Sequence, residues 1–159
     1  MNQPNKIINI DEMNYMFNFD KIRSKVLDII KEPEFIHNRY LKRIISDFEL
    51  LEKLSLSRNK ERVKWGIDVP DDSSQTIYVW VDALINYYTA LNYPDSSPMK
   101  EGTFSNMIHV LGKEITKFHA IIWPSLLTSI GYPPPLKLLI HNFWTNNGVF
   151  IIRLRCQKD

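Results

Sequence analysis

The sequence predicts an α/β protein with a parallel β-sheet and a helical segment at its amino-terminal end. Two short apolar strands, 76–80 and 107–111, each lead directly into a helical pattern, and a third apolar strand follows at 136–140. Strands that alternate with helices in this way are typical of parallel sheets. A chain of 159 residues has the length of one ordinary domain with a real core, so we expect a single domain.

Two amphipathic helices are expected before the first strand. Asp20 can cap a helix that runs to about Lys31, because its apolar residues recur at spacings of three and four. A second helix is expected from about Asn38 to Leu54, with one apolar face and one charged face. The pattern alone does not exclude a simple helical hairpin, so both interpretations stay open.

The first strand-to-helix junction lies at 76–91. Residues 76–80 are rich in β-branched and aromatic side chains, and Asp82 stands where a helix N-cap is expected. On the helix that follows, Ala83 and Tyr87 share a face with Trp80 near its entrance. Two such junctions side by side form a cleft, although a tryptophan in this position also fits ordinary core packing.

The second junction lies at 107–131. After the strand and Gly112, a helical period places Ile115, His119 and Trp123 on one stripe. Ligands of open α/β sheets bind beyond the carboxyl ends of strands, so Glu114 is placed to accept hydrogen bonds from ribose hydroxyls. His119 and Trp123 can wall an apolar pocket, but a stripe of this kind is more often ordinary core with one hydrogen-bonded histidine.

Composition excludes several classes of protein. No apolar run is long enough to span a membrane. The net charge of +2 is too small to indicate nucleic-acid binding by bulk electrostatics, but a surface for tRNA can still be locally basic, so the charge neither supports nor excludes RNA. Cys156 is the only cysteine, which excludes a disulfide framework and a cysteine zinc site and fits a reducing, intracellular compartment. His37, His109 and His141 lack the spacing of metal ligands and are interpreted as structural. The first ten residues contain no convincing targeting signal.

Three sequence segments resemble those of the class I methionyl-tRNA synthetases, particularly the mitochondrial and bacterial type. They are SLSR followed by WGIDVP, then YVWVDALINYYTAL, then HVLGKEITKFHAIIWP, in the family's order. The resemblance covers about residues 12–149 and corresponds to part of a full-length synthetase. It implies one partial catalytic domain over 1–159 with a Rossmann-like parallel sheet. Within it, 1–58 are mainly helical, 59–149 form the second half of the nucleotide-binding fold, and 150–159 are a divergent tail.

The resemblance also implies roles for individual residues. It assigns the methionine pocket to Trp80, Ala83, Tyr87, Ile115, His119 and Trp123, and ATP binding to Gly112 and Glu114. Most relatives have aspartate at the position of Glu114, and many have proline at that of Leu84. Arg58 is a candidate contact for the active site or the tRNA end, and a solvated arginine is its alternative.

The implied function is ATP-dependent activation of methionine, with Mg²⁺, followed by transfer to tRNA. This chemistry needs positioned groups more than a nucleophilic side chain, so no catalytic residue is assigned, and no protein-bound zinc is expected. The implied compartment is mitochondrial or cytoplasmic, with mitochondrial favoured. The family's H-I-G-H motif is absent, and Phe150 stands where the first lysine of K-M-S-K-S is expected. A truncated form is therefore expected.

Two alternatives stay open. One is a degenerate module that binds methionine or an adenylate without catalysis, and the other is a structural or interaction domain on the same fold. Half of a parallel sheet leaves an exposed edge, so we also expect self-association.

Overall fold

The computed structural model describes residues 11–93 and 106–146, together with the backbone of 149–150. The amino-terminal residues considered as a targeting signal lie outside the described residues, as does most of the expected tail, with Cys156. The chain divides into two compact units, Met1–Asn18 with Lys53–Ala83 and Phe19–Glu52 with Leu84–Asp159. Each unit is described by itself.

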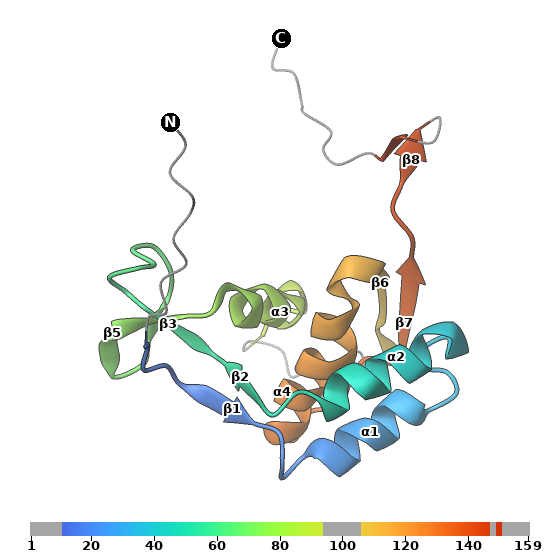
Figure 1. The fold of residues 1–159 in the computed structure, drawn as a ribbon, viewed down its shortest axis with the longest axis horizontal. Helices are drawn as coiled ribbons and strands as arrows, with labels where there is room; N and C mark the ends of the chain where they lie inside the picture. Colours follow the sequence, from blue (N-terminus) through green and yellow to red (C-terminus); the bar gives the residue numbers. More distant parts are fainter. Residues whose placement is uncertain (1–10, 94–105, 147–148, 151–159) are drawn as a thin grey trace, which may run out of the picture. The chain divides into compact units, whose positions relative to one another are not determined.

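The first unit is built from short antiparallel strands (Figure 1). Strand β1 (Met16–Asn18) pairs with β2 (Lys53–Ser55), and β5 (Asp72–Ile77) lies between β3 (Ser57–Asn59) and β4 (Asp68–Val69). All of these pairs are antiparallel.

The expected strand at 76–80 was therefore wrong in its bounds and its pairing. Strand β5 ends at Ile77, and Val79 already begins a helix. The antiparallel pairing follows from the turn that precedes β5, where Asp71 adopts a left-handed φ of 63°. Aspartate tolerates this conformation, and the tight reversal pairs Val69 with Asp72 and makes β4 and β5 antiparallel neighbours.

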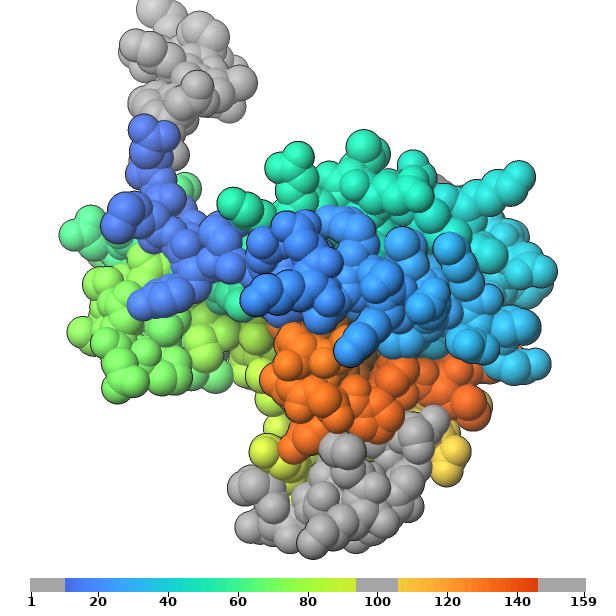
Figure 2. Space-filling view, turned by 90° about the horizontal axis from the view of Figure 1, so that it is seen from below, coloured from blue at the N-terminus to red at the C-terminus, as the bar shows by residue number. Residues whose placement is uncertain are grey.

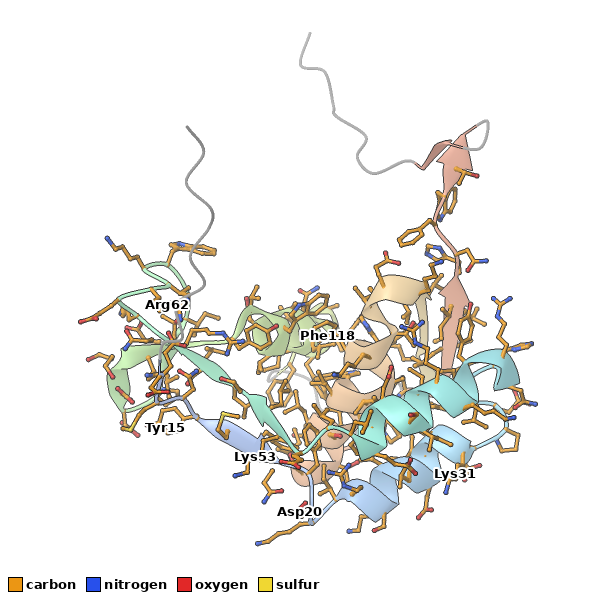
Figure 3. The ribbon with its side chains drawn as sticks, in the orientation of Figure 1. Tyr15, Asp20, Lys31, Lys53, Arg62 and Phe118 are labelled. Atoms are coloured by element: carbon orange, nitrogen blue, oxygen red, sulfur yellow. The ribbon has the colours of Figure 1, made fainter. Side chains whose placement is uncertain are left out.

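Two helices open the second unit and lie side by side in Figure 1. Helix α1 covers Arg23–Lys31, so Asp20 lies ahead of it and Lys31 at its end (Figure 3). Helix α2 covers Asn38–Glu49 and ends earlier than expected. The Arg23 guanidinium donates to the carbonyl oxygens of Phe48 at 2.6 Å and Leu51 at 2.8 Å, and so ties the start of α1 to the end of α2 and the residues just after it.

The parallel strands that the sequence predicted at 107–111 and 136–140 are confirmed. Strand β6 (Ile108–Gly112) pairs in parallel with β7 (Lys137–His141), and His109 lies opposite Leu138. On its other edge β7 is bridged by Ile36, where the Leu138 N–H donates to the Phe35 carbonyl at 2.7 Å. The fold is thus α/β, with one parallel strand pair among the described residues.

The helical run after β6 changes its geometry twice. It begins as the 3₁₀ turn Lys113–Ile115, becomes π-helical over Phe118–Ile122, and continues as α4 (Trp123–Ser129). Figure 3 labels Phe118, where the π-helical segment starts and whose carbonyl accepts from the Trp123 N–H five residues later. Pro124 has no N–H to donate to the preceding turn, which favours this wider turn. The run ends near Gly131, which has a φ of +76°.

Helix α3 (Val79–Ala90) begins in the first unit and continues into the second. It starts three residues before Asp82, which lies in its first turn and not at its N-cap.

In the second unit α4 packs directly against α1, as Figure 2 shows in orange and blue. The strands β8 (Thr145–Asn146) and β9 (Val149–Phe150) form a short hairpin. Within the described residues, no helix combines the length and apolar character needed to cross a membrane.

Candidate functional site

Four ring-bearing side chains of the second unit meet beside the end of β6. We call Tyr87, His109, His119 and Trp123 the aromatic cluster. The ring of Tyr87 lies at its centre, stacked on His109 with centroids 4.0 Å apart and an interplanar angle of 27°. The ring centroid of His119 lies 5.7 Å from that of Tyr87 in an edge-to-face arrangement, and the centroid of Trp123 lies 6.0 Å from it. The cluster joins α3 to β6 and to the helical run that follows β6.

A defined hydrogen-bond chain runs through the aromatic cluster. The Nδ1 atom of His119 lies 3.1 Å from the Ile115 carbonyl oxygen, which can only accept, so Nδ1 carries the proton. In a neutral imidazole the Nε2 atom is then an acceptor, and the Tyr87 hydroxyl donates to it at 2.7 Å. This hydrogen bond holds the Tyr87 hydroxyl oxygen beside the Nε2 atom of His119.

Burial keeps the aromatic cluster uncharged. It lowers the pKa of His119, and it raises the pKa of Tyr87. Burial, followed by the neighbouring His119, lowers the pKa of His109 from 6.5 to about 4. Both imidazoles are therefore neutral at pH 7. The cluster is suited to an apolar, polarizable group more than to an anion or a cation.

His109 is the member of the aromatic cluster that sequence reasoning missed as a site residue. Its side chain is 3% exposed, and its Nδ1 atom is buried without a hydrogen-bond partner in the described part of the chain. The signal was the alternation of β6, in which Ile108 and Val110 are exposed while His109 and Leu111 are buried. That alternation places His109 on the face that carries the cluster.

Gly112 and Glu114, which the sequence analysis assigned to ATP, lie together at the carboxyl end of β6. A Cβ atom built on Gly112 would lie 2.5 Å from a carboxylate oxygen of Glu114, so the carboxylate folds against the glycine. Glu114 also lines a cavity of about 250 Å³ with Lys113, Lys117 and residues of α2. Its exposed carboxylate can accept hydrogen bonds from hydroxyl groups.

The remaining predicted pocket residues are placed differently. Ile115 is half-buried, and its carbonyl oxygen is the acceptor for His119. Trp80 and Ala83 belong to the first two turns of α3 and to the first unit, with Trp80 half-buried and Ala83 exposed. The second unit thus brings together Tyr87, Ile115, His119 and Trp123.

Arg58 is not a freely solvated side chain. Its guanidinium donates to the Ser55 hydroxyl at 2.8 Å and to the Ser57 carbonyl at 2.6 Å, and it lies 4.0 Å from the centroid of the Tyr78 ring. It lines a cavity of about 450 Å³ in the first unit with Trp65, Ile67 and Asp82. Such a fixed guanidinium can hold a planar anion.

No metal centre is found in the part of the chain that the structure describes. Among these residues no group of three or more histidine, cysteine, aspartate or glutamate side chains is arranged to hold an ion.

Comparisons with known proteins point to one family. Residues 3–151 match the family model described as "tRNA synthetases class I (M)". The chain is 43% identical over 141 residues to the mitochondrial methionine–tRNA ligase of Xenopus laevis. The aligned region covers 87% of this chain and 24% of that protein. A probable mitochondrial methionine–tRNA ligase of Schizosaccharomyces pombe is also 43% identical, with 87% and 26% covered.

Solved structures agree. The methionyl-tRNA synthetase of Mycobacterium tuberculosis in complex with methionyl-adenylate superposes with a TM-score of 0.76 at 35% identity, covering 86% of this chain and 27% of that one. The free form of that enzyme superposes with a TM-score of 0.72. The fold is therefore part of a class I, Rossmann-like catalytic domain. The chain spans about a quarter of the length of the relatives that it matches.

Proposed function

Since the chain belongs to the class I methionyl-tRNA synthetases, we propose that it serves methionine–tRNA ligation by binding the methionine side chain in the aromatic cluster. The observation that carries the proposal is the Tyr87 to His119 hydrogen bond of 2.7 Å between neutral rings, with Trp123 beside them. A thioether is polarizable and unbranched and makes favourable contacts with aromatic rings.

The proposed reaction is the attack of the methionine carboxylate on the α-phosphate of ATP, which releases pyrophosphate and gives methionyl-adenylate. Transfer of the methionyl group to the terminal ribose of tRNA follows. In this scheme Glu114 accepts hydrogen bonds from the ribose of ATP, and Gly112 leaves space for its carboxylate. Mg²⁺ enters as the counter-ion of the ATP phosphates and not as a resident metal.

The residues of the first unit have separate places in the proposal. Trp80 and Ala83 complete the methionine pocket by family resemblance, which stays a prediction. For Arg58 we propose a contact with an anionic group of the substrate, because its guanidinium is held in place by Ser55 and Ser57. Within the domain 1–159 we assign 59–149 to the second half of the nucleotide-binding fold, after the segment 1–58 and before the tail 150–159.

Methionine-dependent exchange of pyrophosphate into ATP tests the activation step. Exchange with methionine and none with leucine is the expected result for a competent synthetase. Methionine binding without exchange indicates a binding module, and binding of neither methionine nor ATP contradicts both proposals.

We also propose a mitochondrial location and self-association. The first rests on relatives named as mitochondrial enzymes, and imaging of the tagged protein tests it. The second rests on β6 and β7, whose outward side chains Ile108, Val110 and Leu139 are 49%, 71% and 45% exposed. Parallel sheets are normally covered on both faces, so a second copy of the chain can bury the exposed face of β6 and β7. A monomer by light scattering at micromolar concentration contradicts self-association.

A further inference from the structure

We propose that His109 is a positioning residue, which holds the Tyr87 ring in the orientation that makes the site selective for a thioether over a hydrocarbon chain of equal length. The proposal rests on the proposed function, because it assumes that the aromatic cluster receives a methionine side chain. It adds a residue from β6 to a pocket that the sequence assigned to α3 and the helical run after Gly112.

The geometry around the Tyr87 ring supports this role of His109. His109 is the one member of the aromatic cluster that stacks face to face on Tyr87, with 4.0 Å between centroids. His119 meets the ring at an interplanar angle of 72° and Trp123 at 44°. A stacked neighbour restricts tilting of the ring plane, whereas the hydrogen bond to His119 fixes only the position of the hydroxyl oxygen. The stacking and the hydrogen bond together fix the position and the orientation of the Tyr87 ring.

The chemistry of His109 itself also supports a role beyond core packing. A side chain that only fills space on the buried face of a strand is ordinarily apolar, as Leu111 and Leu138 are. His109 has a buried Nδ1 atom without a partner in the described part of the chain, and its Nε2 atom meets the weakly accepting sulfur of Met107 at 3.1 Å. This arrangement costs stability. Filling space therefore does not explain this residue, and its planar ring is the part that contacts Tyr87.

The consequence concerns selectivity. Sulfur gains from a well-placed aromatic ring in a way that a methylene does not, so the pocket discriminates methionine from norleucine through the ring position. If Tyr87 tilts, both ligands keep their apolar contacts, but methionine loses the sulfur contact. His109 therefore affects the ratio of the two affinities more than the affinity for norleucine.

The test compares three variants by calorimetric titration with methionine and norleucine. His109→Leu removes the planar ring, His109→Phe keeps it, and Leu111→Val is a matched change on the same buried face of β6. We expect His109→Leu to reduce the methionine to norleucine affinity ratio by about two- to tenfold. His109→Phe and Leu111→Val should keep the wild-type ratio. An unchanged ratio in His109→Leu, or an equal loss in all three variants, overturns the proposal.

A measurement without ligand separates this proposal from the function on which it rests. The ¹⁵N signal of His119 Nε2 reports the hydrogen bond from Tyr87, and we expect it to move toward the unbonded value in His109→Leu and to stay in His109→Phe. If the signal moves but the wild type does not bind methionine, the proposed function fails while the positioning of Tyr87 stands. A signal that stays in His109→Leu overturns the positioning.

The wild type supplies a measurement that does not depend on the folding of any variant. Stacking at 4.0 Å predicts strong nuclear Overhauser contacts between the ring protons of Tyr87 and His109. Their absence in the folded wild-type chain also overturns the proposal.

Discussion

Lowering the pH from 7 to 5 should destabilise this chain through His109. The side chain is 3% exposed, and burial, followed by the neighbouring His119, lowers its pKa from 6.5 to about 4. The unfolded chain takes up this proton near pH 6.5, but the folded chain does not until about pH 4. Between these values the unfolded state binds more protons, so stability falls as the pH falls.

The size of the effect follows from the two pKa values. Between pH 7 and pH 5 the linkage relation gives a loss of about 2 kcal/mol in the free energy of unfolding. For a chain of this length that loss lowers the Tm by about 4 to 8 °C. His119 contributes in the same direction, because burial also lowers its pKa.

The assay is urea denaturation of the wild type and of His109→Phe at both pH values. The variant keeps His119 and the carboxylates, so the difference between the two losses isolates His109. We expect the wild type to lose about 2 kcal/mol more than the variant. Equal losses in the two proteins, or an NMR titration midpoint of His109 near 6.5 in the folded wild type, would refute the reasoning.

Three further changes test the fold and the ATP assignment. Ser57 is fully buried, and its hydroxyl accepts from the Tyr15 N–H at 2.9 Å and donates to Gln75 at 2.7 Å, so Ser57→Ala should cost about 1–3 kcal/mol in chemical denaturation. The exposed control Ser73→Ala should cost under about 0.5 kcal/mol, and equal costs contradict the role of the bonds. Phe48→Ala removes a fully buried ring whose centroid lies 5.6 Å from that of Phe19, and should lower the free energy of unfolding in urea by about 3–5 kcal/mol. The control Leu50→Ala, at an 81% exposed position, should lower it by much less, and equal losses contradict the role of the buried ring. Gly112→Ala forces the Glu114 carboxylate to move and should weaken ATP binding in a titration. The free energy of unfolding should change by under about 1 kcal/mol. Unchanged ATP binding contradicts the assignment of Glu114 to the ribose.

The parallel strand pair and the two helices could be predicted from the sequence, because their patterns are local. Strands β6 and β7 are short apolar runs with Gly112 or His141 at their ends, and α1 and α2 carry apolar residues at helical spacing. Helix bounds were less accurate. Helix α2 stops at Glu49, where Arg23, distant in the sequence, contacts the Phe48 carbonyl, and a contact of this kind gives no local pattern.

The antiparallel sheet of the first unit could not be predicted in the same way. The run 76–80 has the composition of a buried strand, and composition does not report the direction of the partner strand. The deciding feature is the left-handed turn at Asp71, together with strand pairing by Ser57–Asn59, which looks like a loop by itself. Pairing of this kind depends on residues that lie far apart in the sequence.

The candidate site was predictable in part. The spacing of His119 and Trp123 on one helical stripe indicated that they share a face, and the structure brings both to Tyr87. The contribution of His109 was missed because a single histidine in an apolar strand carries no spacing signal. The π-helical geometry of Phe118–Ile122 was also not predicted, because one widened turn leaves no periodic pattern in the sequence.

We infer that this chain forms a methionine-selective site in its aromatic cluster, and a thermal melt with increasing methionine tests this inference most directly. At a concentration about 100 times the dissociation constant, binding stabilises the folded state by about 2.7 kcal/mol. We therefore predict that methionine raises the Tm by about 5 to 10 °C, and that leucine at the same concentration leaves it unchanged. A cooperative melt that shifts with neither amino acid, or equally with both, contradicts the claim.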